Sequence, residues 1–249
     1  MIEVSDLHKS FGPIRAVAGL NFEAVDGRIT GLIGPNGAGK TTTFRMIDGM
    51  LTPEKGRILV DGHDIVTDRL AAQRRLGILP DVRGLYPRLT GREHIRYYGS
   101  LRGMAGPGLE ARIDELVARL GMAEFADRRT KGFSRGQQLK VALGRALLHQ
   151  PRNLILDEPT NGLDVISSRA VRDLLREMRD AGHCILLSSH IMAEVSVLCD
   201  QIIIIINGRR IIEGTPDELR AHTGAEEMED VFVSAIGPVA SDGGESVAT

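Results

Sequence analysis

Residues 34–42 have the spacing G-x-x-x-x-G-K-[ST] of a phosphate-binding loop. The loop reads Gly34, Pro35, Asn36, Gly37, Ala38, Gly39, Lys40, Thr41 and Thr42. Glycines allow backbone N–H groups at a helix N-terminus to surround phosphate oxygens, where negative charge is stabilised. Lys40 can reach the β- and γ-phosphates as a compact cation, and the Thr41 hydroxyl suits magnesium. The pattern therefore predicts a site for a nucleoside triphosphate with Mg²⁺.

A second set of reactive side chains follows an aliphatic run at 153–156, which ends abruptly in Asp157 and Glu158. Such a run is typical of a strand buried in the centre of an α/β sheet. Strands of this kind present functional residues at the carboxyl edge of the sheet. The two carboxylates are therefore expected at that edge.

The hydrophobic pattern predicts the elements that position these residues. A strand at 28–33 precedes the loop and a helix begins at Thr41, which is the context that a phosphate-binding loop requires. After residue 150 the pattern alternates between strand and helix, which favours a mostly parallel sheet. The expected elements are a strand at 153–156, a helix at 171–178, a strand at 184–187, a helix at 191–199, a strand at 201–206 and a hairpin through Asn207-Gly208 into 209–212.

Two further groups of elements are predicted beside the parallel sheet and its helices. Alternating runs within residues 2–24 and 56–62 predict an antiparallel β layer. Helical spacing of leucines, with Ser134 as an N-cap, predicts an inserted helical subdomain. The predicted domains are a nucleotide-binding core at 1–89 and 151–220, the helical subdomain at 90–150, and a C-terminal extension at 221–249 that is partly disordered.

The composition excludes several classes of protein. With 31 basic and 33 acidic residues the formal charge is −2, which gives no electrostatic basis for nucleic acid as a bulk partner. The longest strictly apolar run, 202–206, is far shorter than the ~20 residues that span a bilayer, and Met1 opens no signal peptide. Cys184 and Cys199 lack convincing metal-ligand spacing and are expected to be buried. A cytoplasmic globular protein is therefore predicted.

Four motifs occur in a fixed order: Ser134-Arg135-Gly136-Gln137, Leu154 to Glu158, Asn161 to Asp164, and Ser188-Ser189-His190. This set resembles the nucleotide-binding subunit of ATP-binding cassette (ABC) transporters, over nearly the whole chain to about Leu219. The resemblance implies an α/β P-loop NTPase with a RecA-like core that binds and hydrolyses ATP. It makes Asp157 a ligand of Mg²⁺ and Glu158 the base that polarises the attacking water. It also makes His190 a contact of the γ-phosphate and Phe11 the residue that stacks on adenine.

The resemblance further implies a partner subunit. Ser134, Gly136 and Gln137 match the signature motif, which in this family closes over the nucleotide held by the opposite subunit. Asp164 would belong to the loop that crosses the interface. Each chain would then hold half of each active site in a nucleotide-sandwich dimer, and the dimer would drive a separate membrane permease from the inner face of the cell membrane.

The chain departs from the family pattern at two positions. Arg135 stands where the signature motif usually has glycine, and because Ser134 and Gly136 are kept we expect function to be kept. Asp81 stands where the family has its Q-loop glutamine. Its carboxylate is a candidate ligand of Mg²⁺, although it adds negative charge beside a triphosphate.

Residues 79–90 and 157–165 look like the ATPase subunit of sodium-extrusion ABC exporters. Arg83 to Leu89 lie where the family contacts its permease, and an ordinary exposed loop is the simpler alternative there. The rival function is a soluble ABC protein whose ATP hydrolysis times an event on ribosomes, DNA or iron–sulfur assembly. A solitary P-loop kinase is disfavoured, because Ser134 and Glu158 indicate water as the nucleophile.

Overall fold

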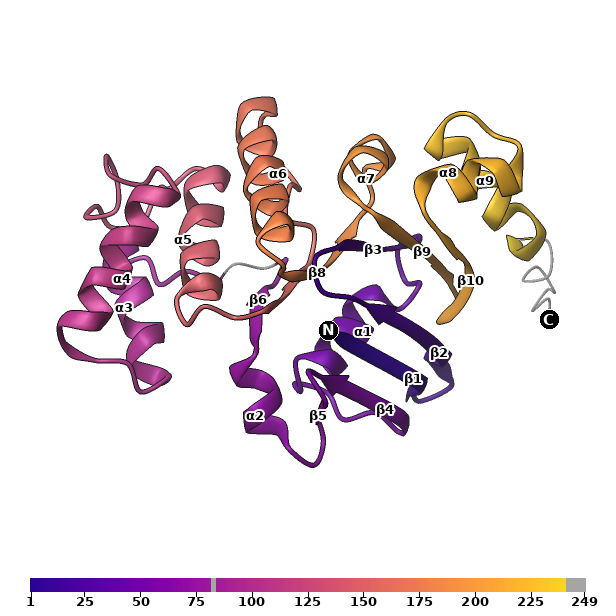
Figure 1. The fold of residues 1–249 in the computed structure, drawn as a ribbon, viewed down its shortest axis with the longest axis horizontal. Coiled ribbons are helices and arrows are strands. Elements are labelled where there is room, and N and C mark those ends of the chain that lie inside the picture. Colours follow the sequence, from indigo (N-terminus) through magenta and orange to yellow (C-terminus); the bar gives the residue numbers. More distant parts are fainter. Residues whose placement is uncertain (82–83, 241–249) are drawn as a thin grey trace, which may run out of the picture.

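The computed structural model describes residues 1–81 and 84–240, which form two β-sheets and nine helices (Figure 1). The strands are β1 (Ile2–Phe11), β2 (Ile14–Ala24), β3 (Ile29–Ile33), β4 (Lys55–Val60), β5 (His63–Asp64), β6 (Leu76–Leu79), β7 (Asn153–Leu156), β8 (Cys184–Ser189), β9 (Gln201–Ile206) and β10 (Arg209–Gly214). The helices are α1 (Lys40–Ile47), α2 (Arg69–Arg74), α3 (Gly91–Leu101), α4 (Gly106–Arg119), α5 (Arg135–Leu147), α6 (Val165–Asp180), α7 (Met192–Leu198), α8 (Pro216–Thr223) and α9 (Met228–Ala240).

The larger sheet has the strand order β10-β9-β3-β8-β7-β6. All its neighbouring strands are parallel except β10, which pairs antiparallel with β9. The predicted α/β fold with a mostly parallel sheet is therefore confirmed. Both faces of this sheet are covered: in β9, Ile203 and Ile205 belong to one hydrophobic core, and Ile202 and Ile204 belong to the other. Burial on both faces explains why the strands are continuous aliphatic runs without polar alternation.

The smaller sheet is antiparallel, with the order β2-β1-β4-β5, and it confirms the predicted β layer. Helix α1 shares one hydrophobic core with this sheet and with one face of the larger sheet. Phe44, Met46 and Ile47 supply the apolar side of α1 in that core. Because α1 is fixed by both sheets, the loop between β3 and α1 is held at the carboxyl edge of the parallel strands.

Helices α3, α4 and α5 form a group at the end of the molecule opposite α8 and α9 (Figure 1). Leu109, Ile113 and Leu116 lie buried on one side of α4, as their spacing predicts. Ser134 begins α5 in a capping box: its Oγ accepts from Gln137 N at 3.2 Å, and Gln137 Oε1 accepts from Ser134 N at 3.1 Å. The predicted N-cap is therefore confirmed, and it fixes the first turn of α5.

The chain after β9 packs back on the core. Asn207 and Gly208 both have positive φ, at 49° and 74°, as a tight hairpin between β9 and β10 requires. In the C-terminal extension, Met228 and Val231 of α9 are buried in the hydrophobic core, and α9 continues to Ala240. Partial disorder is predicted within the extension at 221–249, and residues 241–249 of it lie outside the described residues, so that prediction stays a prediction.

Cys184 and Cys199 are both buried and free, as expected, and burial raises the pKa of the Cys184 thiol to about 12. Within residues 1–81 and 84–240, no helix has both the length and the apolar character that crossing a bilayer requires.

Candidate nucleotide site

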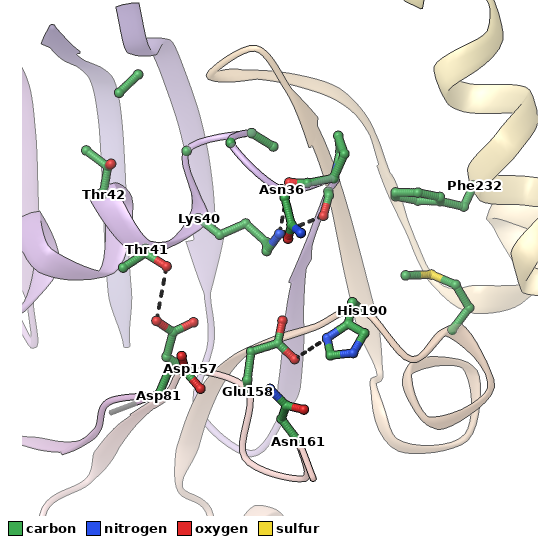
Figure 2. A pocket seen from close by; sticks show the side chains of 17 residues that line it. Asn36, Lys40, Thr41, Thr42, Asp81, Asp157, Glu158, Asn161, His190 and Phe232 are labelled. Atoms are coloured by element: carbon green, nitrogen blue, oxygen red, sulfur yellow. Dashed lines mark hydrogen bonds and ion pairs between the residues drawn. The ribbon is translucent and has the colours of Figure 1, made fainter. Parts of the chain in front are cut away.

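A cavity of about 560 Å³ opens at the carboxyl edge of the parallel strands (Figure 2). It is lined by the loop before α1, by the residues after β7, and by side chains from two later segments. The lining residues are Ala16, Gly34, Pro35, Asn36, Gly37, Ala38, Gly39, Lys40, Thr41, Thr42, Asp81, Asp157, Glu158, Asn161, His190, Met192 and Phe232. The fold therefore brings the two predicted sets of reactive side chains, the loop and the carboxylates, into one cavity.

The loop before α1 is shaped for close approach by phosphate. Gly39 has a φ of 103°, and a Cβ at this position would lie 2.3 Å from the carbonyl oxygen of Ala16, so only glycine fits. Lys40 is 8% exposed, and its Nζ donates to the carbonyl oxygens of Gly34 at 2.6 Å and Pro35 at 3.0 Å. Burial lowers the pKa of Lys40, while the charges of Glu158 and Asp157 act in the opposite direction.

Asp157 lies beside the first turn of α1. Its Oδ2 accepts from Thr41 Oγ1 at 3.2 Å, and its Oδ1 accepts from Ser188 Oγ at 2.6 Å. The side chains of Thr41 and Asp157 thus meet at one point of the cavity wall, and Asp81 lines the same cavity. Magnesium prefers one or two carboxylates together with phosphate and water oxygens. The hydroxyl and carboxylates present here fit that preference.

No group of three or more His, Cys, Asp and Glu side chains in the described part of the chain could hold a metal ion by itself. In a magnesium–nucleotide site the phosphates themselves supply part of the coordination, so one or two protein carboxylates suffice. The residues at the cavity are therefore compatible with a metal that arrives with its nucleotide.

Glu158 has a backbone conformation that is rare for a residue with a side chain. Its φ is 51°, in the left-handed region, which costs about 1–3 kcal/mol and persists where the surroundings enforce it. Its backbone N donates to Ser188 Oγ at 3.0 Å, and its Oε2 lies 2.7 Å from His190 Nδ1. The structure thus turns the Glu158 carboxylate into the cavity and pairs it with His190 (Figure 2).

Ser188 connects the two neighbouring acids, and sequence reasoning names it only as part of a motif. The hydroxyl of this fully buried residue donates to Asp157 and accepts from the backbone N of Glu158. One side chain on β8 therefore sets the orientation of both acids at the end of β7.

Phe11 does not line the cavity. It ends β1 with 48% of its surface exposed, and Lys9 Nζ lies 5.8 Å from the centre of its ring. Its predicted stacking on adenine stays a prediction. By contrast, Phe232 of α9 points into the cavity from the side of His190, although no motif indicates it (Figure 2).

Ser134, Gly136, Gln137 and Asp164 lie together but away from the cavity lining. Asp164 caps α6, accepting from Ser167 N at 2.8 Å and from Ser167 Oγ at 2.8 Å, and these hydrogen bonds lower the pKa of Asp164. A Cβ at Gly136 would lie 3.2 Å from Ser167 Oγ, so the N-termini of α5 and α6 are close neighbours. These four residues therefore form a second cluster on the same chain.

Arg135, which departs from the usual signature motif, also belongs to this cluster. Gly162 has a φ of 70°, and a Cβ there would lie 2.0 Å from Arg135 Nη1. The guanidinium therefore occupies the space that the missing side chain leaves.

The chain is similar to known proteins in both sequence and fold. A family model described as ABC transporter matches residues 17–161. The chain is 39% identical over 241 residues to the ABC transporter ATP-binding protein NatA of Bacillus subtilis (strain 168), covering 95% of this chain and 98% of that protein. It is 36% identical over 231 residues to the Nod factor export ATP-binding protein I of Paraburkholderia xenovorans (strain LB400), covering 93% and 76%.

Solved structures show the same fold. An ATP-binding subunit of an ABC transporter has a TM-score of 0.86 and 30% identity, covering 94% of this chain and 99% of that one. A dimeric structure of the bacterial ABC transporter cassette MJ0796 has a TM-score of 0.78 and 25% identity, covering 87% and 99%. The predicted P-loop NTPase fold is confirmed, and the chain belongs to the ABC transporter family, as an ATP-binding ATPase.

Proposed function

We propose that the chain is the ATPase subunit of an ABC exporter and drives a separate membrane permease, with sodium as the transported ion. The observation that carries the ATPase chemistry is the Glu158 carboxylate, which is held in a strained backbone conformation 2.7 Å from His190 and beside the Thr41–Asp157 pair. Export is supported by the name of the Nod factor relative. Sodium is supported by the resemblance of residues 79–90 and 157–165.

In the proposed reaction each residue keeps the role that the motifs predict. Residues 34–42 bind the phosphates through backbone N–H groups, and Lys40 exchanges the loop carbonyls for phosphate oxygens. Glu158 orients and polarises the attacking water while His190 holds the Glu158 carboxylate and contacts the γ-phosphate. Mg²⁺, held by Thr41 and Asp157 with Asp81 as a further ligand, would neutralise charge on the phosphates. We retain Phe11 as the adenine contact.

The second cluster is proposed to act on a second copy of the chain. Ser134, Gly136, Gln137 and Asp164 lie outside the cavity of their own chain, as a half-site contributed to the partner requires. The dimeric cassette among the structural relatives supports this arrangement. Because ATP would bridge two surfaces only in the closed dimer, nucleotide binding would favour closure.

The proposed permease contact spans residues 83–89, before α3. Tyr86 is 51% exposed, yet its backbone N donates to His94 Nε2 at 2.8 Å and its carbonyl oxygen accepts from Thr130 Oγ1 at 2.8 Å. The segment thus presents an aromatic ring on a fixed backbone. Arg83, which begins the predicted contact, lies outside the described residues. The dimer would sit at the inner face of the membrane through this contact.

We retain the predicted domain division, with a core at 1–89 and 151–220, a helical subdomain at 90–150 and an extension from 221. The placement of α3, α4 and α5 at one end of the molecule supports it.

Replacing Glu158 by Gln tests the chemistry. The amide keeps the shape of the side chain but cannot act as a base, so turnover should fall by about 100-fold or more. ATP binding should persist, and a dimer should accumulate with ATP. Phosphate release measures the turnover, and light scattering measures the molar mass of the dimer.

The exposed Glu124 on the helical group offers a matched control, and Glu124→Gln should behave like the wild type. A Glu158→Gln variant that hydrolyses ATP normally and stays monomeric would contradict the role of Glu158 as the base. For transport, the chain copurified with its permease should move sodium across vesicles in an ATP-dependent way. Absence of sodium flux from an ATP-hydrolysing complex would contradict the proposed ion.

A further inference from the structure

Two short segments, 158–160 and 190–194, are joined by two side-chain hydrogen bonds. The first joins Glu158 to His190 at 2.7 Å. The second joins Thr160 to Glu194, with Thr160 Oγ1 donating to Glu194 Oε2 at 2.5 Å. Thr160 and Glu194 do not line the cavity. The second contact therefore lies outside the nucleotide site.

Glu194 lies where an unpaired charge would be costly. Its side chain is 14% exposed, and its other carboxylate oxygen, Oε1, lies 3.4 Å from Arg172 Nη1. Thr160 is 4% exposed. A carboxylate that is largely removed from water needs hydrogen bonds or an opposite charge, and here each oxygen has a partner. The three side chains therefore form a closed polar network.

This network connects three elements. Glu194 is on α7, which begins two residues after His190. Arg172 is on α6, which begins directly after Asp164. Thr160 lies in the loop that joins Glu158 to Asp164. Glu194 is thus bound to the loop at Thr160 and to the helix that continues the loop.

The loop needs such support because it starts from a strained residue. Glu158 has a positive φ, which a residue with a side chain keeps only when its surroundings enforce it. Inside the loop there are two backbone hydrogen bonds, from Asn161 N to Glu158 O and from Leu163 N to Thr160 O, each with an N···O distance of 3.2 Å. Thr160 is the point at which a side chain ties the loop to α7.

We propose that Glu194 is a positioning residue for ATP hydrolysis: through Thr160 it holds the loop so that the Glu158 carboxylate stays aligned with His190. The inference rests on the proposed role of Glu158 as the base. Helix α7 would then support the loop at 158–164 through Glu194. The Thr160 hydroxyl would affect turnover although it does not contact the nucleotide.

Thr160→Val removes the hydroxyl and keeps the shape of the side chain. Because misplacement of a base by a fraction of an ångström slows the reaction, kcat should fall by about tenfold or more. The KM and Kd for ATP should stay within about twofold, since the phosphate-binding loop is untouched. Thr160→Ser restores the hydroxyl and should restore kcat. Thr67→Val, at an exposed position after β5, is the matched control and should leave kcat unchanged.

Glu194→Ala and the double variant with Thr160→Val complete the test. If the two residues act through one contact, the double variant should be no slower than the slower single variant. Wild-type kcat in Thr160→Val, or failure of Thr160→Ser to restore kcat, would overturn the inference. So would a loss of thermal stability with an unchanged kcat per folded molecule.

The same measurements separate this inference from the proposed function. If Glu158→Gln abolishes turnover and Thr160→Val does not, only the positioning role of Glu194 fails. If Glu158→Gln leaves turnover intact, the role of Glu158 itself fails.

Discussion

Three charged side chains with little exposure line the cavity. Lys40 and Asp157 are each 8% exposed, and the side chain of Glu158 is 15% exposed. Lys40 donates to two neutral carbonyl oxygens of its own loop. Phosphate oxygens are stronger acceptors for this cation than neutral carbonyl oxygens, because their negative charge adds a Coulomb attraction. ATP affinity should therefore depend directly on this side chain.

Lys40→Ala should weaken ATP binding by about tenfold or more, which corresponds to ~1.4 kcal/mol of binding free energy. Titration calorimetry with ATP measures the change. Lys55, whose side chain is 69% exposed and pairs with Asp6, offers the control, and Lys55→Ala should keep wild-type affinity. Equal ATP affinity in the wild type and Lys40→Ala would contradict our placement of the phosphates.

The residues of the cavity were predictable to different degrees. Motif spacing identifies Lys40 and Asp157, because the backbone of the tight loop and of the strand end fixes the position of each side chain. It does not identify Phe232, since α9 is far along the chain and reaches the cavity only by tertiary packing. Nor does spacing place the ring of Phe11, which depends on how the end of β1 turns.

At the scale of elements, the junction between the helical subdomain and the larger sheet contains a partly buried histidine. His149 follows α5, and its Nε2 is 2.9 Å from the carbonyl oxygen of Leu76 on β6. Burial, followed by the charge of Arg102, lowers the pKa of His149 to about 4. The neutral imidazole is therefore the form that fits the folded protein.

This lowered pKa predicts a loss of stability in mild acid. An unfolded histidine takes up a proton below a pH of about 6.5, whereas the folded one does so only near its lowered pKa. The unfolded state then binds more protons, so the free energy of unfolding should decrease as the pH falls from about 6.5 to about 4. In His149→Gln this decrease should be smaller, by on the order of 1–2 kcal/mol between pH 7 and pH 4.5.

Urea unfolding at the two pH values tests this prediction. The amide of Gln can still donate to the Leu76 carbonyl oxygen, so the variant separates protonation from loss of the hydrogen bond. The same pH dependence in His149→Gln and the wild type would show that another group causes the acid sensitivity.

Long periodic elements were predictable from the sequence, and short ones were not. The aliphatic runs of β7, β8 and β9 predict buried strands because both of their faces are covered. Helix α2 has six residues and no side-chain cap, and β5 has two residues. Neither is long enough to show a period, so tertiary contacts determine them. The pattern in α9 is interrupted by Gly237 and Pro238, which hides the apolar side that packs on the core.

At the scale of the whole molecule, the two clusters of motif residues lie on different parts of one chain. Lys40, Asp157 and Glu158 line the cavity, whereas Ser134 and Gly136 lie at the N-terminus of α5 and do not. If the clusters act together across a dimer, loss of one cluster in one chain can be complemented by the other chain.

Mixing Lys40→Ala with Ser134→Ala should therefore restore activity that neither variant has alone. A mixed dimer contains one site with both changes and one intact site. With random pairing of equal amounts, roughly a quarter of all sites should be intact. Lys40→Ala mixed with Asp157→Asn is the control, since both changes lie on the same side and every site remains damaged. ATPase activity no higher in the first mixture than in the second would contradict a shared site.

The position of β3 between β8 and β9 also has a consequence for how the chain is made. Strand β3 ends at residue 33, but its neighbours begin at residues 184 and 201. At a synthesis rate of about 5–20 residues per second, β3 waits roughly 8–30 s for the first of these partners. The sheet that supports the phosphate-binding loop can therefore be completed only after β8 and β9 have been translated, and we expect the aliphatic strand β3 to need protection from aggregation until then.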